Sequence, residues 1–301
     1  MSDTKVENDA ELEAEAEIAA AIKAAAAASQ DEEMSVLGHS DAVLHLKFSP
    51  SPPKTQYNTD IDESSEKPLL LTYFTIQGLG EVPKLILAEA GMPYEYIGLT
   101  GSEDQSLAME WRSRSPNGLL PILSGAGIPR SSPISQSGAI IRFLAKRLGM
   151  DCGDIVASSR ADVLYETAKD FGDSKNREAI ASINPEKDYS VAKGPFSTGK
   201  MIEKMLIGMA DPKDEGAALN YGQIQLFYVL LHCEGRRSGC VKENLGDVLD
   251  NFRINMENRA GLKEYLNSTA RFPFTKGELG VDGGFVFSTG PLKRGDIKCA
   301  A

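Results

Sequence analysis

The spacing of apolar residues changes several times along the chain and predicts a different structure for each part. The stretch PLLLTYF, from Pro68, is almost continuously apolar and predicts a buried strand. The segment EVPKLILAEAG has helical spacing, with Pro83 in its first turn and Gly91 at its end, and YEYIGL predicts a second strand. A strand, a helix and a strand in such close succession predict a βαβ unit with parallel strands.

The residues that follow predict a hairpin and then an all-helical region. LLPIL and the turn-rich SGAGIPRSSPIS predict two antiparallel strands, and QSGAIIRFLAKRLG predicts an amphipathic helix that ends at Gly149. From Ser158 to about Asn267 the apolar spacing is helical throughout. Asn220, followed three positions later by Gln223, has the pattern of a capping box, in which each side chain bonds the other residue's backbone N–H.

The residues before Pro68 lack such patterns. Residues 9–29 form an Ala/Glu block of high helix propensity with few large apolar side chains, and residues 49–67 combine Pro, Ser and acids as extended linkers do. We therefore predict four parts: an acidic, mostly disordered extension over 1–67, an α/β domain over 68–150, an all-helical domain over 151–272 and a C-terminal tail over 273–301. On this division, removal of residues 1–66 is expected to leave the fold intact.

Charge and composition narrow the classes of function. The net charge is −11, and residues 1–67, with 15 acids and 5 bases, carry most of it. The remainder is nearly neutral and has no cluster of Lys and Arg, so nucleic acid is not expected as a partner. No apolar run is long enough to cross a bilayer, and the acidic start resembles neither a secretory signal nor a transit peptide, so we expect a cytoplasmic protein.

The cysteines and histidines predict no metal site. Cys152, Cys233, Cys240 and Cys299 are scattered without a Cys-x-x-Cys pair, which is typical of free thiols in a reducing compartment. The three histidines do not combine with them at the spacings of known zinc sites.

Four local motifs resemble one family. LTYFTIQGLGE at 71–81, Leu120-Pro121 with a strand after it, SQSGAIIRFLAKRLG at 135–149 and, more weakly, ADVLYETAKDF at 161–171 occur in the order and separation of the cytosolic glutathione S-transferase superfamily. The resemblance is to its tyrosine-type members, which include the alpha, mu, pi and sigma classes. It implies an α/β thioredoxin-like N-terminal domain, βαβ followed by ββα, and an all-α C-terminal domain.

The resemblance implies roles for residues in three of these motifs. Tyr73 would donate its phenolic O–H to the glutathione sulfur, although a strand is also an ordinary place for an aromatic residue. Pro121 would follow a cis peptide bond that exposes the Leu120 backbone to glutathione, although X-Pro bonds are usually trans. Gln136 and Ser137 would bind the γ-glutamyl carboxylate at a helix N-terminus, although Ser137 or its neighbour Ser135 could simply cap that helix.

Three further roles depend on the resemblance alone. Asp170 would reach the γ-glutamyl amine in the partner subunit of a homodimer, with a solvated helix acid as the alternative. Trp111 would lie beside the glycyl end of glutathione, and Arg112 or Arg114 would face its carboxylate; the sequence does not choose between them. In the first loop the family commonly has two arginines, whereas this chain has Gln77 and Leu79.

The function implied by the resemblance is the transfer of glutathione to small apolar electrophiles. Glutathione would be the co-substrate, with no metal, in a homodimer without nucleic-acid or membrane partners. Two alternatives stay open: a glutathione-dependent isomerase of the prostaglandin type, because the pattern is nearest to sigma, and a non-catalytic binding or scaffold protein, because Gln77 and Leu79 replace the arginines.

Overall fold

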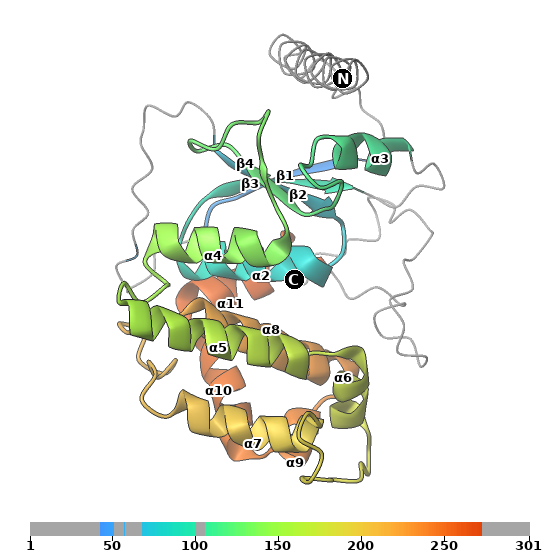
Figure 1. Ribbon diagram of the computed structural model, residues 1–301, viewed down its shortest axis with the longest axis vertical. Helices are drawn as coiled ribbons and strands as arrows, with labels where there is room; N and C mark the ends of the chain where they lie inside the picture. Colours follow the sequence, from blue (N-terminus) through green and yellow to red (C-terminus); the bar gives the residue numbers. More distant parts are fainter. Residues whose placement is uncertain (1–42, 51–56, 58–67, 100–105, 273–301) are drawn as a thin grey trace, which may run out of the picture.

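The computed structural model describes residues 43–50, 57, 68–99 and 106–272, and its strands form one five-stranded sheet in the order β1-β3-β2-β4-β5 (Figure 1). Two central strands are parallel and the other pairings are antiparallel. The strands are β1 (Val43–Phe48), β2 (Leu69–Phe74), β3 (Tyr94–Leu99), β4 (Ile122–Ser124) and β5 (Ile134–Ser135).

The predicted βαβ unit and hairpin are both present. Helix α2 (Gly78–Glu89) connects the parallel strands β2 and β3, and β4 and β5 are an antiparallel pair that leads into α4 (Ser137–Leu148). Helix α4 ends at Gly149, whose φ of 77° is the left-handed conformation that glycine adopts at helix ends. Helix α3 (Ser106–Ser113) lies between β3 and β4 in the chain. This order confirms the thioredoxin-like prediction.

The second part is helical, as its spacing predicts, and lies on the side of α2 and α4 away from the sheet (Figure 1). Asn220 and Gln223 form the predicted capping box, with the Asn220 side chain accepting from the Gln223 N–H at 3.0 Å and the reverse bond at 3.1 Å. The helices are α5 (Ile155–Phe171), α6 (Ser174–Ala181), α7 (Pro195–Leu206), α8 (Tyr221–Arg236), α9 (Cys240–Leu245), α10 (Asp247–Asn258) and α11 (Ala260–Leu266).

Strand β1 differs from the prediction that residues up to 67 stand apart from the fold. It pairs with β3 along its whole length, from Val43 opposite Leu99 to Phe48 opposite Tyr94. Phe48 makes edge contacts with the rings of Tyr94 and Tyr265, at centroid distances of 5.8 and 5.7 Å. The apolar side of the strand gains burial there and its backbone gains hydrogen-bond partners, which explains its place at the sheet edge. The Ala/Glu helix predicted at 9–29 and the tail predicted at 273–301 lie outside the described residues.

A second contact from the same region joins both halves of the molecule. The Tyr57 hydroxyl donates to Glu89 Oε1 at 2.9 Å and accepts from the Leu219 N–H at 3.2 Å. Glu89, at the end of α2, also accepts a hydrogen bond from Arg259 Nε at 2.8 Å. The Glu89 side chain is 2% exposed and the Arg259 side chain is 3% exposed. Buried charges are tolerated where each is paired and hydrogen-bonded, so Tyr57 completes a cluster between the sheet domain and the helical domain.

Candidate active site

The register of the sheet brings three of the predicted site motifs to one edge. Thr72 in β2 lies opposite Ile122 in β4, and Ile122 lies opposite Ser135 in β5. The next residues along these strands are Tyr73, Pro121 and Gln136, which therefore follow each other across the same end of the sheet. Tyr73 lies 48 positions before Pro121, and Pro121 lies 15 before Gln136, so strand pairing brings together residues that are separated in the sequence.

Tyr73 lies beneath the first turn of α2. A Cβ atom at Gly80 would come within 2.7 Å of the Tyr73 ring, and one at Gly78, where φ is +35°, would come within 2.9 Å of the phenol oxygen. Glycine at both positions lets the helix backbone approach the ring this closely. The ring is 5% exposed and packs edge-on against Phe74 at 5.3 Å between centroids.

The phenol oxygen of Tyr73 accepts a hydrogen bond from the Leu79 backbone N–H at 3.3 Å. A hydroxyl oxygen can accept such a bond on a lone pair while its O–H acts as a donor. Because the donor is backbone, the contact does not depend on the side chain at position 79. The Leu79 side chain itself is 54% exposed.

The peptide bond between Leu120 and Pro121 is cis, as the resemblance implies. Leu120 and Pro121 are buried, whereas Leu119 before them is 50% exposed. Asn117 holds the approach to this turn, because its Oδ1 accepts from the Leu119 N–H at 3.2 Å and from the Ser115 hydroxyl at 2.9 Å.

Gln136 is the N-cap of α4 and has φ 69° and ψ 118°, a conformation that residues other than glycine rarely adopt. Its side chain is exposed and makes no capping hydrogen bond, and Ser137, the first helical residue, is half-buried. Neither serine at this helix start is the cap. A strained backbone at an uncapped helix N-terminus is the arrangement expected where a bound carboxylate meets the N–H groups.

The arginines near Trp111 differ in what they contact. Arg114 lies over the Trp111 ring, with Cζ 4.5 Å from the centroid, and its Nη2 is 2.7 Å from Glu110 Oε1. The Nε of Arg112 is buried and has no hydrogen-bond partner in the described part of the chain. Arg114 is therefore already paired, and Arg112 keeps a donor to offer.

Asp170 lies at the end of α5 with an exposed side chain. Its backbone carbonyl accepts from Asn176 Nδ2 at 3.2 Å and from the Asp173 N–H at 3.1 Å, which fixes the turn between α5 and α6. Within one chain no contact joins its carboxylate to the edge of the sheet among the described residues.

Gln77 makes a long-range contact that its position in the sequence does not predict. Its side chain is 2% exposed and donates Nε2–H to the Phe272 carbonyl at 2.7 Å. Nearby, Glu81 and Lys84 form a buried ion pair at 3.0 Å, and the Tyr265 hydroxyl donates to the same carboxylate at 2.9 Å. The loop after β2 is therefore held by residues nearly 200 positions further along the chain. No local pattern predicts such a contact.

Comparison with known proteins identifies the first domain. Residues 70–146 match the model of the glutathione S-transferase N-terminal domain. Glutathione S-transferase 1 of Ascaris suum is 33% identical over 101 residues, which is 34% of this chain and 45% of the relative. The hematopoietic prostaglandin D synthase of Gallus gallus is 34% identical over 101 residues, 34% of this chain and 46% of the relative. The chain thus spans about half the length of these curated relatives.

The fold likeness extends further than the sequence likeness. The structure of a Nu-class glutathione S-transferase from Haemonchus contortus superposes with a TM-score of 0.53 at 18% identity, covering 69% of this chain and 98% of that one. At this identity the match concerns the fold. No helix in the described ranges has the length and apolar character needed to span a bilayer. Residues 70–146 therefore belong to the glutathione S-transferase N-terminal domain family, and the chain as a whole has the fold of the glutathione S-transferases.

Proposed function

We propose that this protein binds glutathione at the edge of the sheet beside Tyr73 and conjugates it, through its thiolate sulfur, to an apolar electrophile. The observation that carries the proposal is the Tyr73 phenol at the end of β2, with the Leu79 N–H on its oxygen and Gly78 against it. The phenol O–H would donate a hydrogen bond to the glutathione sulfur. That bond would stabilise the thiolate form of glutathione at the site. Stabilising the thiolate by one pKa unit takes about 1.4 kcal/mol, within the reach of one charge-assisted hydrogen bond.

In the reaction the thiol proton leaves to water, and the thiolate held by Tyr73 attacks an electrophilic carbon. A carbon–sulfur bond forms, and with an aryl halide the carbon–halogen bond breaks and the halide departs with its electron pair. The other site residues would hold the tripeptide. Leu120 would pair its backbone with the cysteinyl unit, Gln136 and Ser137 would receive the γ-glutamyl carboxylate, and Trp111 would lie beside the glycyl end.

For the glycyl carboxylate we propose Arg112 as the partner, because Arg114 is paired with Glu110 and stacked on Trp111. The Arg112 Nε, buried and without a partner among the described residues, would gain one from the ligand. Asp170, exposed at the end of α5, would act on the γ-glutamyl amine across a homodimer.

Two other functions each have an observation in their favour. The likeness to a prostaglandin D synthase favours glutathione-dependent isomerisation, in which the thiolate adds to the substrate and is released again. The 5% exposure of Tyr73, with Gln77 and Leu79 at the start of α2 in place of arginines, favours binding without turnover.

Titration with glutathione tests the proposal. We expect wild type to bind it with an ultraviolet difference band of thiolate and to conjugate chlorodinitrobenzene. Tyr73→Phe should keep binding but lose the thiolate band and most of the turnover. Tyr189→Phe is the matched control, since that side chain is 53% exposed in the described structure. Equal turnover in wild type and Tyr73→Phe would refute the role of the phenol. Glutathione binding without turnover in wild type would instead favour the non-catalytic binding protein.

A further inference from the structure

The chain that leaves Tyr73 returns to it within a few residues. Strand β2 ends at Phe74, and five positions later the Leu79 N–H donates to the Tyr73 phenol oxygen. The geometry of this hydrogen bond therefore depends on the shape of residues 74–78. A short connecting segment keeps one shape only where it is bonded to parts of the protein that are themselves rigid.

Two side-chain hydrogen bonds hold this segment near its two ends. The Tyr96 hydroxyl, from the neighbouring strand β3, donates to the Phe74 carbonyl at 2.7 Å. The Gln77 side chain donates to the Phe272 carbonyl, also at 2.7 Å. The rings of Tyr96 and Phe272 are themselves in contact, at 5.4 Å between centroids. Both ends of the segment are thus bonded to one pair of touching residues, which we call the Tyr96–Phe272 clamp.

A buried ammonium holds the two rings of the clamp together. Lys84 of α2 is fully buried, and its Nζ lies 5.1 Å from the Tyr96 ring centroid and 4.5 Å from that of Phe272. The same Nζ is 3.0 Å from Glu81 Oε2 and 3.4 Å from the Ala270 carbonyl oxygen. Cation–π attraction is strongest where the cation has lost its water, so Lys84 favours the packed arrangement of the clamp.

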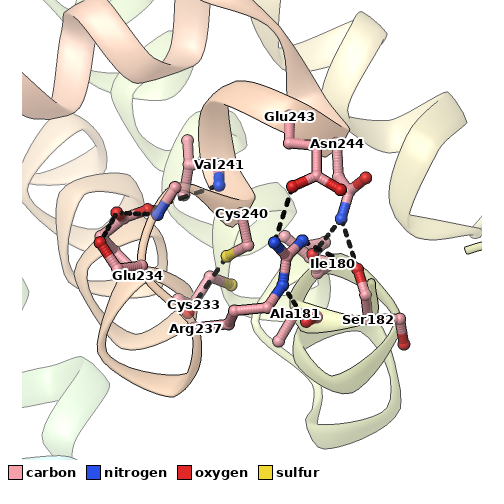
Figure 2. A network of polar contacts seen from close by, with 12 residues as sticks. Ile180, Ala181, Ser182, Cys233, Glu234, Arg237, Cys240, Val241, Glu243 and Asn244 are labelled. Atoms are coloured by element: carbon pink, nitrogen blue, oxygen red, sulfur yellow. Dashed lines mark hydrogen bonds and ion pairs between the residues drawn. The ribbon is translucent and has the colours of Figure 1, made fainter. Parts of the chain in front are cut away.

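The helical domain that carries Phe272 is cross-linked at a distance from the clamp. Figure 2 shows Arg237, which follows α8, donating to the Ala181 and Ser182 carbonyls at the end of α6, at 2.6 and 2.9 Å. Asn244 of α9 donates to the same Ser182 carbonyl at 2.9 Å. A single residue separates α9 from α10, and another separates α10 from α11. Phe272 therefore follows a set of helices whose mutual positions are fixed.

We propose that Tyr96 is a positioning residue for Tyr73, and that the clamp sets how strongly the phenol stabilises the glutathione thiolate. Tyr96 acts through the Phe74 carbonyl, where the chain leaves the strand, and the rest of the clamp acts at the other end of residues 74–78. Together they fix the Leu79 N–H on the Tyr73 oxygen, whose O–H then donates to the sulfur. The effect on the thiolate rests on the proposed function, whereas the hold of the clamp on residues 74–78 does not.

Hydrogen–deuterium exchange without glutathione measures the hold of the clamp. Tyr96→Phe removes the hydroxyl but keeps the ring. Tyr94→Phe is the matched control, because Tyr94 lies on the same face of β3, is equally buried, and its hydroxyl has no hydrogen-bond partner in the described part of the chain. We expect Tyr96→Phe to speed exchange of the amides of residues 75–80 about 10-fold or more, and Tyr94→Phe to leave that exchange unchanged.

Titration of bound glutathione measures the effect on Tyr73. The pH dependence of the thiolate band gives the pKa of the glutathione thiol, and we expect this pKa to be higher in Tyr96→Phe than in wild type. The kcat for chlorodinitrobenzene should fall ~3–10-fold, while KM for glutathione should change less than about twofold. Phe272→Leu, which keeps an apolar side chain but removes the ring, should shift the thiol pKa in the same direction.

All variants are compared at a temperature at which circular dichroism shows each of them folded, because a merely structural role would lower stability without moving the thiol pKa. Unchanged exchange in Tyr96→Phe would overturn the clamp, and faster exchange with an unchanged thiol pKa would overturn the positioning role of Tyr96. Equal effects of Tyr94→Phe and Tyr96→Phe would do the same. If wild type neither binds nor conjugates glutathione, the proposed function fails, and the exchange result alone then decides whether the clamp holds residues 74–78.

Discussion

Tyr57 offers the most direct test of whether the residues ahead of the first predicted strand belong to the fold. We expect Tyr57→Phe to lower the free energy of unfolding substantially although it removes a single oxygen atom. That oxygen donates to Glu89, which also pairs with Arg259, and accepts from the Leu219 N–H. Burial raises the pKa of this phenol well above its ordinary value, so it remains a donor at neutral pH.

The size of the effect follows from these partners. A hydrogen bond to a charged group contributes roughly 1.5–3 kcal/mol, and a buried N–H left without an acceptor costs about 1–3 kcal/mol. Some of this is recovered by relaxation or by water, so we expect a loss of about 2–4 kcal/mol. For a protein whose stability is typically about 5–15 kcal/mol, this is a large fraction.

Urea denaturation followed by circular dichroism measures this loss as a lower midpoint at unchanged slope. Tyr189→Phe, on an exposed loop residue, is the matched control and should shift the free energy by less than about 0.5 kcal/mol. A double-mutant cycle with Glu89→Gln should show coupling, because both changes break the same bond. If Tyr57→Phe behaves like the control, the cluster between the two domains does not stabilise the protein and the argument is wrong.

Further predictions concern other contacts. Deletion of residues 1–66, which removes β1 and Tyr57, should lower the melting temperature by more than Tyr57→Phe does in thermal unfolding. Asn220→Ala should cost about 1 kcal/mol in urea denaturation, since it breaks the capping box; an unchanged midpoint would contradict this cap. Gly80→Ala should reduce turnover with little loss of helicity, because the new Cβ would displace the Tyr73 ring. Burial and the neighbouring arginines lower the pKa of His232 to about 3, so the unfolded chain takes up a proton at this histidine first as pH falls below about 6.5. Stability should therefore drop by up to about 1.4 kcal/mol per pH unit, and His232→Gln should flatten that slope between pH 6.5 and 5 in urea denaturation.

The elements with a strong local pattern could be predicted from the sequence. The β2–α2–β3 unit, the hairpin, the helix that ends at Gly149 and the capping box at Asn220 each depend on residues close together in the chain. The sequence of strand β1 has only a short alternation of apolar and polar residues. Leu46 and Phe48 are partly buried and alternate with exposed His45 and Lys47, which lie beside Glu95 on the neighbouring strand. Four alternating residues next to an acidic, proline-rich stretch are too few to predict a strand.

The sequence could predict only those parts of the candidate site whose positions follow from the pairing of the strands. Tyr73, Pro121 and Gln136 meet because β2, β4 and β5 are neighbours, and the motif order already implied that arrangement. The choice between Arg112 and Arg114 required side-chain contacts, since both lie within one turn of Trp111.

Gln77 shows why a departure from a family pattern cannot be interpreted from the position alone. Taken as a missing arginine, it suggested a weaker site. In the structure its amide is buried and binds the Phe272 carbonyl, so the start of α2, which carries Leu79 and its N–H, is fixed against the end of the helical domain. An arginine there would have to bury a charge at the same place. Gln77 thus anchors the residue two positions before Leu79, whose N–H is directed at Tyr73, with a neutral amide in place of the charge that the family pattern supplies.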